Sequence, residues 1–148
     1  MKAKRGFTLV EILIVVVILG ILAAIVIPQF TEASTEAKTN SLMSDLQTVR
    51  SQIQLYKVQH SDDFPGSGTA SFADSLTGYT DSAGAAWVEG TSTGTKYGPY
   101  LERIPNNPFT GVNTVDVDGT QGDASNGWYF NSSTGEFTAD DTAGHAAL

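Results

Sequence analysis

The chain of 148 residues contains no cysteine and few positive charges. The lack of cysteine removes disulfide support and any cysteine nucleophile. Only eight Lys and Arg side chains oppose sixteen Asp and Glu side chains, which gives a formal net charge of −8. This balance argues against nucleic-acid binding through bulk electrostatics. A phosphate-binding loop of the G-x-x-x-x-G-K-[ST] type is also missing, and no nucleophile stands beside a suitable base. We therefore predict that the chain is not an enzyme.

Metal-ligating residues are sparse as well. The two histidines, His60 and His145, are far apart in sequence, and we predict no metal role for either. Three carboxylates, those of Asp116, Asp118 and Asp123, lie in a turn-rich segment of the kind that calcium uses. Because this segment lacks the EF-hand spacing, solvated turn acids are the favoured interpretation. Calcium stays the alternative, and no other cofactor is predicted.

One long apolar run dominates the first part of the chain. It extends from Phe7 to Ile27 and contains a single charged residue, Glu11. As a helix it would be about 31 Å long, enough to cross the hydrocarbon core of a bilayer. The run is longer than the apolar part of a secretory signal, and no A-x-A cleavage site follows it. We therefore predict a retained membrane anchor with the basic residues before it in the cytoplasm.

Glu11 is the unusual residue of this run, because an ionisable group inside a membrane segment is costly and points to a function. Its position near the headgroup end leaves a second interpretation open, in which the carboxylate simply reaches the membrane interface.

The sequence around this glutamate resembles a known processing signal. Residues 2–11 contain a short basic leader, Gly6, and then Phe-Thr-Leu-Val-Glu at the start of the apolar run. This order resembles the recognition sequence of type IV prepilins and type II secretion pseudopilins. The resemblance implies cleavage by a prepilin peptidase between Gly6 and Phe7, N-methylation of Phe7, and a role in assembly for Glu11. It also implies that Gly20 and Pro28 form a segment where the helix is weak.

A second helical stretch follows the anchor. The apolar residues Leu42, Leu46, Val49, Ile53 and Tyr56 repeat at intervals of four and three, which places them on one helix face. No glycine or proline interrupts residues 29–61. We therefore predict one helix over residues 8–59, bent near Pro28 because proline removes a helical hydrogen bond.

The remainder of the chain predicts a small sheet. Residues 71–76 could form one helical turn, and residues 77–96 form an irregular loop in which Tyr79 and Trp87 are candidate packing anchors. Three short strands are expected over residues 114–117, 128–131 and 136–139. The expected fold class is α+β and pilin-like, with a small antiparallel β-sheet packed on the C-terminal half of the helix.

These patterns favour a structural subunit of a type IV filament. The expected parts are a cleaved leader (1–6), a transmembrane and assembly half of the helix (7–30) and a periplasmic or extracellular head (31–148). We favour a pseudopilin of a type II secretion-like system. The alternatives are a surface pilin for adhesion, motility or DNA uptake, and a membrane-anchored binding domain that never polymerises. The expected partners are further copies of the chain, the prepilin peptidase, other pilins or pseudopilins and an inner-membrane assembly platform.

Overall fold

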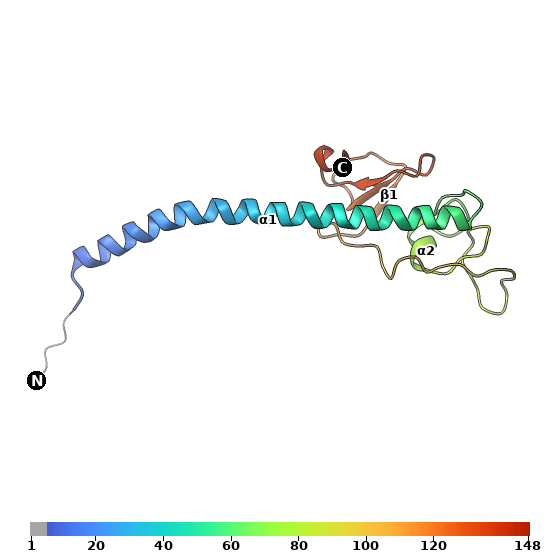
Figure 1. Cartoon of the computed structure of the whole chain (residues 1–148), viewed down its shortest axis with the longest axis horizontal. Coiled ribbons are helices and arrows are strands. Elements are labelled where there is room, and N and C mark those ends of the chain that lie inside the picture. The colour runs from blue at the N-terminus through green and yellow to red at the C-terminus, as the bar shows by residue number, and fades with distance from the viewer. Residues whose placement is uncertain (1–5) are drawn as a thin grey trace, which may run out of the picture. The chain divides into compact units, whose positions relative to one another are not determined.

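The computed structural model describes residues 6–148, so the basic leader residues lie outside the described part of the chain. The chain divides into two compact units, residues 1–37 and 38–148. One helix, α1 (Leu9–Gln59), extends from the first unit into the second (Figure 1). It ends just before Ser61 and Asp62, which adopt positive φ angles of 57° and 75° that do not continue a helix. The predicted helix over residues 8–59 is confirmed.

The second unit carries every other regular element of the described chain. Helix α2 (Phe72–Thr77) begins at the predicted place, where the Ser71 side chain accepts a hydrogen bond from the Asp74 backbone N–H. Three strands follow, namely β1 (Val115–Val117), β2 (Trp128–Phe130) and β3 (Phe137–Ala139). A short helix near the C-terminus, α3 (Ala143–Ala146), was not predicted, because four residues are too few to show a helical period.

The sheet is mixed, so the prediction of a wholly antiparallel sheet was wrong. The strand order is β1-β2-β3, with β2 and β3 antiparallel as expected from the short turn between them. However, β1 pairs with β2 in the parallel direction, and Val115 lies opposite Trp128. The connection over residues 118–127 returns the chain to the end of the sheet at which β1 began, which a tight hairpin turn cannot do.

The core of the second unit forms where α1 meets the sheet. The predicted stripe of five residues is fully confirmed, since each is at most 1% exposed: Leu42, Leu46, Val49, Ile53 and Tyr56. Trp128 and Phe130 of β2 join this core, whereas Tyr129 between them points away from it. Phe72 of α2 links the strands, because its ring lies 4.3 Å from Phe130 and 5.9 Å from Phe137 between ring centroids.

A side-chain contact also fastens the sheet to the helix. The Arg50 Nε donates to the backbone oxygen of Phe137 at 2.8 Å, and its Nη1 donates to the oxygen of Leu148 at 3.1 Å. One residue of α1 therefore holds both β3 and the last described residue. Sequence periodicity gives no sign of this contact, because it joins positions that are 87 and 98 residues apart.

The loop between α2 and β1 is irregular, as predicted, but its anchors are not the predicted ones. Tyr79 is 47% exposed, and neither it nor Trp87 joins the buried core. The Lys96 ammonium instead lies over the Tyr79 ring, 4.2 Å from its centroid. Thr80 fastens the loop through backbone hydrogen bonds with Tyr97 and through its Oγ1, which lies 2.9 Å from the Nε2 of buried His60.

Candidate functional site

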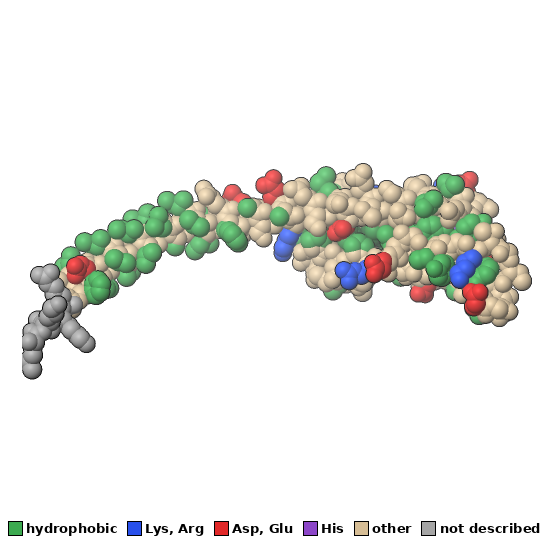
Figure 2. Space-filling view, turned by 60° about the horizontal axis from the view of Figure 1, so that its bottom comes forward, with side chains coloured by type: hydrophobic (Ala, Val, Ile, Leu, Met, Phe, Trp, Pro, Cys, Tyr) green, Lys and Arg blue, Asp and Glu red, His purple; other side chains and the backbone are tan. Residues whose placement is uncertain are grey.

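The first half of α1 exposes its apolar side chains all round, and Figure 2 shows those of one face. Each large apolar side chain from Leu9 to Phe30 is at least 52% exposed. An 18-residue window of this helix has a mean hydropathy of 3.3, which makes α1 long and apolar enough to cross a membrane. A soluble monomer rarely exposes so much contiguous apolar surface. This half of the helix therefore needs lipid or other helices around it.

The start of this helix is organised by a reciprocal pair, Thr8 and Glu11. Thr8 donates two hydrogen bonds to Glu11 Oε2, one from its backbone N–H and one from its hydroxyl, each at 2.8 Å. The Glu11 N–H in turn lies 3.3 Å from the Thr8 hydroxyl oxygen. This arrangement is a capping box, which satisfies the free donors at a helix N-terminus. The T-x-x-E spacing is visible in the sequence, but the capping box was not predicted from it.

The capping box gives Glu11 a structural task in addition to the predicted assembly role. It points the carboxylate toward the N-terminal end of α1, the end at which Phe7 lies. The structure thus places Glu11 close to the predicted cleavage point. Its pairing with a mature N-terminus stays a prediction.

Gly6 and Phe7 lie just before α1 and are both exposed. Phe7 is 84% exposed, so its ring packs against little else in the chain. A Cβ atom placed on Gly6 would meet nothing within 4 Å, and its φ is outside the left-handed region. The fold therefore does not require glycine at this position, and processing at the Gly6–Phe7 bond stays a prediction.

The predicted weak segment, Gly20 to Pro28, lies inside α1. Pro28 has no N–H, so the carbonyl of Ala24 lacks its usual helical partner. Three residues after the proline, the Thr31 hydroxyl donates to the Ile27 carbonyl at 3.1 Å. A Cβ on Gly20 would meet nothing within 4 Å, so the glycine is not required by packing in this chain alone. The bend near Pro28 stays a prediction.

The three candidate calcium ligands are not gathered into one ligand set. Asp118 accepts hydrogen bonds from the backbone N–H and the hydroxyl of Ser132, at 2.8 Å and 2.5 Å. These bonds hold the pKa of the Asp118 carboxyl below its ordinary value. Asp123 accepts from the Ser125 N–H at 2.9 Å, and its pKa is lowered by hydrogen bonding to Ser125.

A different carboxylate, Asp140, organises the loop that contains Asp123. Asp140 is fully buried and accepts hydrogen bonds from the backbone N–H groups of Gly122 and Asn126, at 2.7 Å and 3.1 Å. Within residues 6–148, no group of three or more His, Cys, Asp or Glu side chains is arranged to hold a metal ion. The residues thus form no ready calcium site, and the calcium hypothesis stays untested.

Both histidines have structural partners. The ring of His60 stacks on that of Tyr56 at a centroid distance of 3.7 Å and is buried at the end of α1. The Nδ1 of His145 lies 2.5 Å from Asp141, whose other oxygen accepts from Asn107. Through these contacts both histidines act as packing groups, which hold the long loop and the C-terminal segment.

Comparison with known proteins connects this site to a superfamily. A family profile described as the prokaryotic N-terminal methylation motif matches residues 1–27. The type II secretion system core protein G of Klebsiella pneumoniae is 29% identical over 109 residues, covering 74% of this chain and 71% of that protein. These two similarities support the predicted resemblance to type IV pilins and type II secretion pseudopilins.

Other relatives in this superfamily share a shorter region. The core protein G of Pseudomonas aeruginosa is 41% identical over 59 residues, which cover 40% of this chain and 42% of that protein. A fimbrial protein of Pseudomonas aeruginosa is 44% identical over 50 residues, covering 34% of this chain and 32% of that protein. The chain thus spans about two fifths or less of the length of these two relatives. No solved structure matches the chain.

Proposed function

We propose that this chain is a structural subunit of a filament that assembles from the inner membrane, and specifically a pseudopilin of a type II secretion-like system. The observation that carries the proposal is the first half of α1, whose apolar side chains are exposed all round behind the Thr8–Glu11 pair. Such a segment can rest in lipid before assembly and pack against like helices afterwards, where dispersion and close packing drive association.

The choice of pseudopilin over surface pilin follows from the length of the matched regions. The match to the Klebsiella core protein G covers 109 residues, more than the leader and α1 together contain, so it must include part of the head. The match to the fimbrial protein covers 50 residues. A surface pilin is the second candidate, because this shorter match has the higher identity.

Glu11 supplies the charge for assembly in this proposal. After cleavage the amine of Phe7 would be a cation at the N-terminus, four residues before Glu11 and just ahead of the start of α1. In an array of axially staggered helices, the carboxylate of one copy meets the amine of the next. The low dielectric of the membrane and of a helix bundle penalises an unpaired charge, so this pairing favours the correct stagger.

The test separates this assembly role from helix capping. Glu11→Gln keeps a hydrogen-bonding side chain but removes the charge, whereas Thr8→Ala removes the capping hydroxyl and keeps the charge. An uncompensated buried charge costs about 3–5 kcal/mol, so Glu11→Gln should reduce the yield of sheared filaments at least about a hundredfold. Thr8→Ala should assemble far better, because capping contributes only about 1 kcal/mol.

The strains for this test contain no wild-type subunit, and immunoblots of membrane fractions check that both variants are inserted and cleaved. An equal loss of filament yield in the two variants would mean that Glu11 acts through helix capping alone. Normal filaments from Glu11→Gln would show that the charge of Glu11 is not needed for assembly. The better explanation would then be that its carboxylate simply reaches the membrane interface. A chain that is cleaved and membrane-bound but never forms filaments would support the anchored binding domain.

A further inference from the structure

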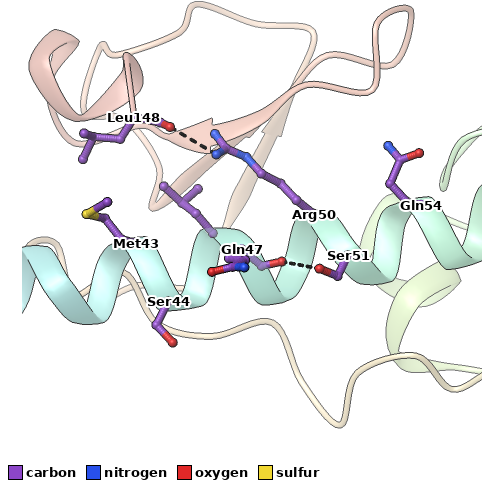
Figure 3. A pocket seen from close by; sticks show the side chains of 8 residues that line it. Met43, Ser44, Gln47, Arg50, Ser51, Gln54 and Leu148 are labelled. Carbon is purple, nitrogen blue, oxygen red and sulfur yellow. Dashed lines mark hydrogen bonds between the residues drawn. The ribbon is translucent and has the colours of Figure 1, made fainter.

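The three-stranded sheet has two edges, and they differ in how they are covered. At the β3 edge, the backbone oxygen of Phe137 accepts the hydrogen bond from Arg50 Nε, and α3 contacts the strand. Arg50 also donates to the oxygen of Leu148, which keeps the C-terminal residue beside this edge (Figure 3). Proteins commonly cover sheet edges in this way, because an unpaired strand can pair with another chain.

The β1 edge instead carries backbone groups without a strand beside them. The Thr114 carbonyl accepts a hydrogen bond from β2 at 3.0 Å, and the Asp118 N–H donates one to β2 at 2.9 Å. Because successive residues of a strand direct their N–H and C=O groups to opposite sides, those of Val115 and Val117 point away from β2. Within residues 6–148, β2 is the only strand that pairs with β1, so these four groups have no ladder partner.

A groove follows this open edge. It has a volume of about 380 Å³, and residues of β1 and of the start of α2 contribute to its walls. We call it the edge groove; it is lined by residues 71–73, Ile104, residues 113–115 and Val117. Phe72 and Ile104 are buried, whereas Val117 is 44% exposed. An apolar side chain placed in the edge groove would therefore cover Val117 and extend the core.

The two faces of β1 differ in their chemistry. Val115 lies opposite Trp128 in the ladder and packs against the same core, so Val115 and Val117 direct their side chains to the core face. Asp116 lies between them and directs its side chain to the other face. In the part of the chain that the structure describes, Asp116 takes part in no salt bridge. A strand that pairs with β1 would therefore meet an apolar surface on one face and a carboxylate on the other.

The charges next to the edge groove are mostly negative. Three acids and one base adjoin its lining in the sequence, namely Asp74, Asp116, Asp118 and Arg103. The Ser71 hydroxyl, which lines the groove, donates to the Asp74 carboxylate at 2.7 Å and so holds this acid beside it. The whole chain also has a formal net charge of −8. Charge complementarity therefore favours a partner with basic side chains.

We propose that the β1 edge binds an extended segment of another protein in which apolar and basic residues alternate. The segment adds a strand to the sheet, and its backbone pairs with the N–H and C=O groups of Val115 and Val117. Its apolar side chains enter the edge groove. Its basic side chains lie on the other face, beside Asp116, where an opposite charge on a neighbouring strand is favourable.

A second copy of β1 fits this edge less well than a basic segment does. Antiparallel pairing centred on the strand would place the Asp116 side chains of the two copies opposite each other, and like charges in that position are destabilising. The inference goes beyond the proposed function, because it concerns the head alone and does not depend on filament formation.

A synthetic peptide provides the first test. A short fluorescent peptide of alternating lysine and valine is titrated against the detergent-dissolved full chain, and binding is followed by fluorescence anisotropy. We expect saturable binding that is at least about tenfold tighter than that of the same peptide with glutamate in place of lysine, because the edge is acidic.

Matched variants test whether the peptide binds at β1. Val117→Pro removes an N–H that the sheet does not use, whereas Val117→Thr keeps both this N–H and a branched side chain. Val117→Pro should weaken binding at least about tenfold, and Val117→Thr should change it little. Asp116→Asn should reduce the preference for lysine over glutamate several-fold, whereas Asp62→Asn, at an exposed acid outside the sheet, should preserve it. Circular dichroism melts check that the head of each variant is folded.

Hydrogen exchange gives a readout in the wild type that needs no variant. The amides of Val115 and Val117 should exchange fast in the free chain, whereas the Asp118 amide is protected by its bond to β2. A site that is about 90% occupied is open for about a tenth of the time, so the peptide should slow exchange at both valines about tenfold. Exchange at Asp118 should stay nearly unchanged.

The outcomes separate this inference from the proposed function. The absence of saturable binding, equal binding of the two peptides, or unchanged exchange at Val115 and Val117 would each overturn the inference. A dimer of the detergent-dissolved wild type that Val117→Pro abolishes would assign the edge to a second copy and overturn the choice of occupant. None of these measurements uses filaments, so a chain that never forms filaments would overturn the proposed function and leave this inference intact.

Discussion

Ile53 and Leu46 belong to the core that α1 forms with the sheet, and both are at most 1% exposed. The same core contains rings of β2, β3 and α2, which have fixed shapes and cannot easily fill a cavity. The contribution of these two side chains to the stability of the head is therefore large and specific to their positions.

Leu46→Ala and Ile53→Ala should each lower the free energy of unfolding of the head by about 2–5 kcal/mol, through lost burial and a residual cavity. Thermal or urea unfolding of a soluble head that begins at Thr31 gives the measurement. Gln47→Ala, at an exposed position of the same helix, is the control and should change stability by less than about 0.5 kcal/mol. Unchanged melts for both core variants would contradict the described core.

Asp118 makes head stability depend on pH in the acid range. Its pKa is lowered in the folded state by the two hydrogen bonds from Ser132, so its contribution is fully present above the unfolded pKa. The contribution is lost as pH falls through the lowered folded pKa. Asp118 also has a positive φ of 59°, which asparagine tolerates well, so Asp118→Asn tests the charge without adding backbone strain.

We expect Asp118→Asn to lower the melting temperature near neutral pH and to weaken its fall between about pH 5 and pH 2. Asp62→Asn is the matched control, because Asp62 is exposed and also has a positive φ. Melts of the wild type and both variants across this range provide the measurement. An identical pH profile for Asp118→Asn and the wild type would show that the bonds to Ser132 do not stabilise the head.

At the scale of the element, α1 consists mostly of residues that favour a helix and contains one segment of weak helix propensity. Glycine costs about 1 kcal/mol and proline about 3 kcal/mol relative to alanine within a helix. Both occur in the apolar half, at Gly20 and Pro28, while the half that enters the head contains neither. Any loss of helical structure during assembly should therefore begin between these two residues.

We predict that a filament map of the wild type shows extended backbone between Gly20 and Pro28, and that Pro28→Ala restores helix there, because alanine returns the missing N–H. Gly20→Ala should have a smaller effect, in proportion to its smaller propensity change. The measurement is electron cryomicroscopy of filaments from each strain. A straight, unbroken helix through Pro28 in the wild type would refute this prediction.

The regular elements were predictable to different degrees for physical reasons. The stripe from Leu42 to Tyr56 follows the helical period, so burial on one face could be deduced without any partner. The strands were visible from alternation and turn residues, yet the direction of β1 was not, because pairing direction depends on where the connection over residues 118–127 leads. The contact of Arg50 with Phe137 depends on tertiary structure alone.

The residues of the candidate site also differ in how far they could be predicted from the sequence. The position of Glu11 followed from the motif, and its capping partner Thr8 could have been found from the T-x-x-E spacing. The structural role of Asp140 could not have been predicted from the sequence. Its partners Gly122 and Asn126 reach it only after β3 has paired with β2. Carboxylates near one another in sequence, such as Asp118 and Asp123, suggested calcium but have separate serine partners.

At the scale of the whole molecule, the proposed processing would determine when a subunit can assemble. The uncleaved chain has no free amine at Phe7, so the predicted partner of Glu11 does not yet exist. We expect intact-mass analysis of filament material to find a chain that begins at Phe7 and carries one N-methyl group. Gly6→Leu should leave the leader attached, because a peptidase cleft admits glycine backbone closely. Met1 retained in assembled wild-type material would contradict this.

The attachment of the sheet to α1 has a mechanical consequence under the proposed function. A filament carries force along its length, and each head must transmit it between its helix and its strands. Among residues 6–148, the backbone ladders join strands to strands, whereas the sheet meets α1 through packed side chains and the bond from Arg50 to Phe137. Under shear, the head should therefore yield by sliding of the sheet along the helix before its strands separate.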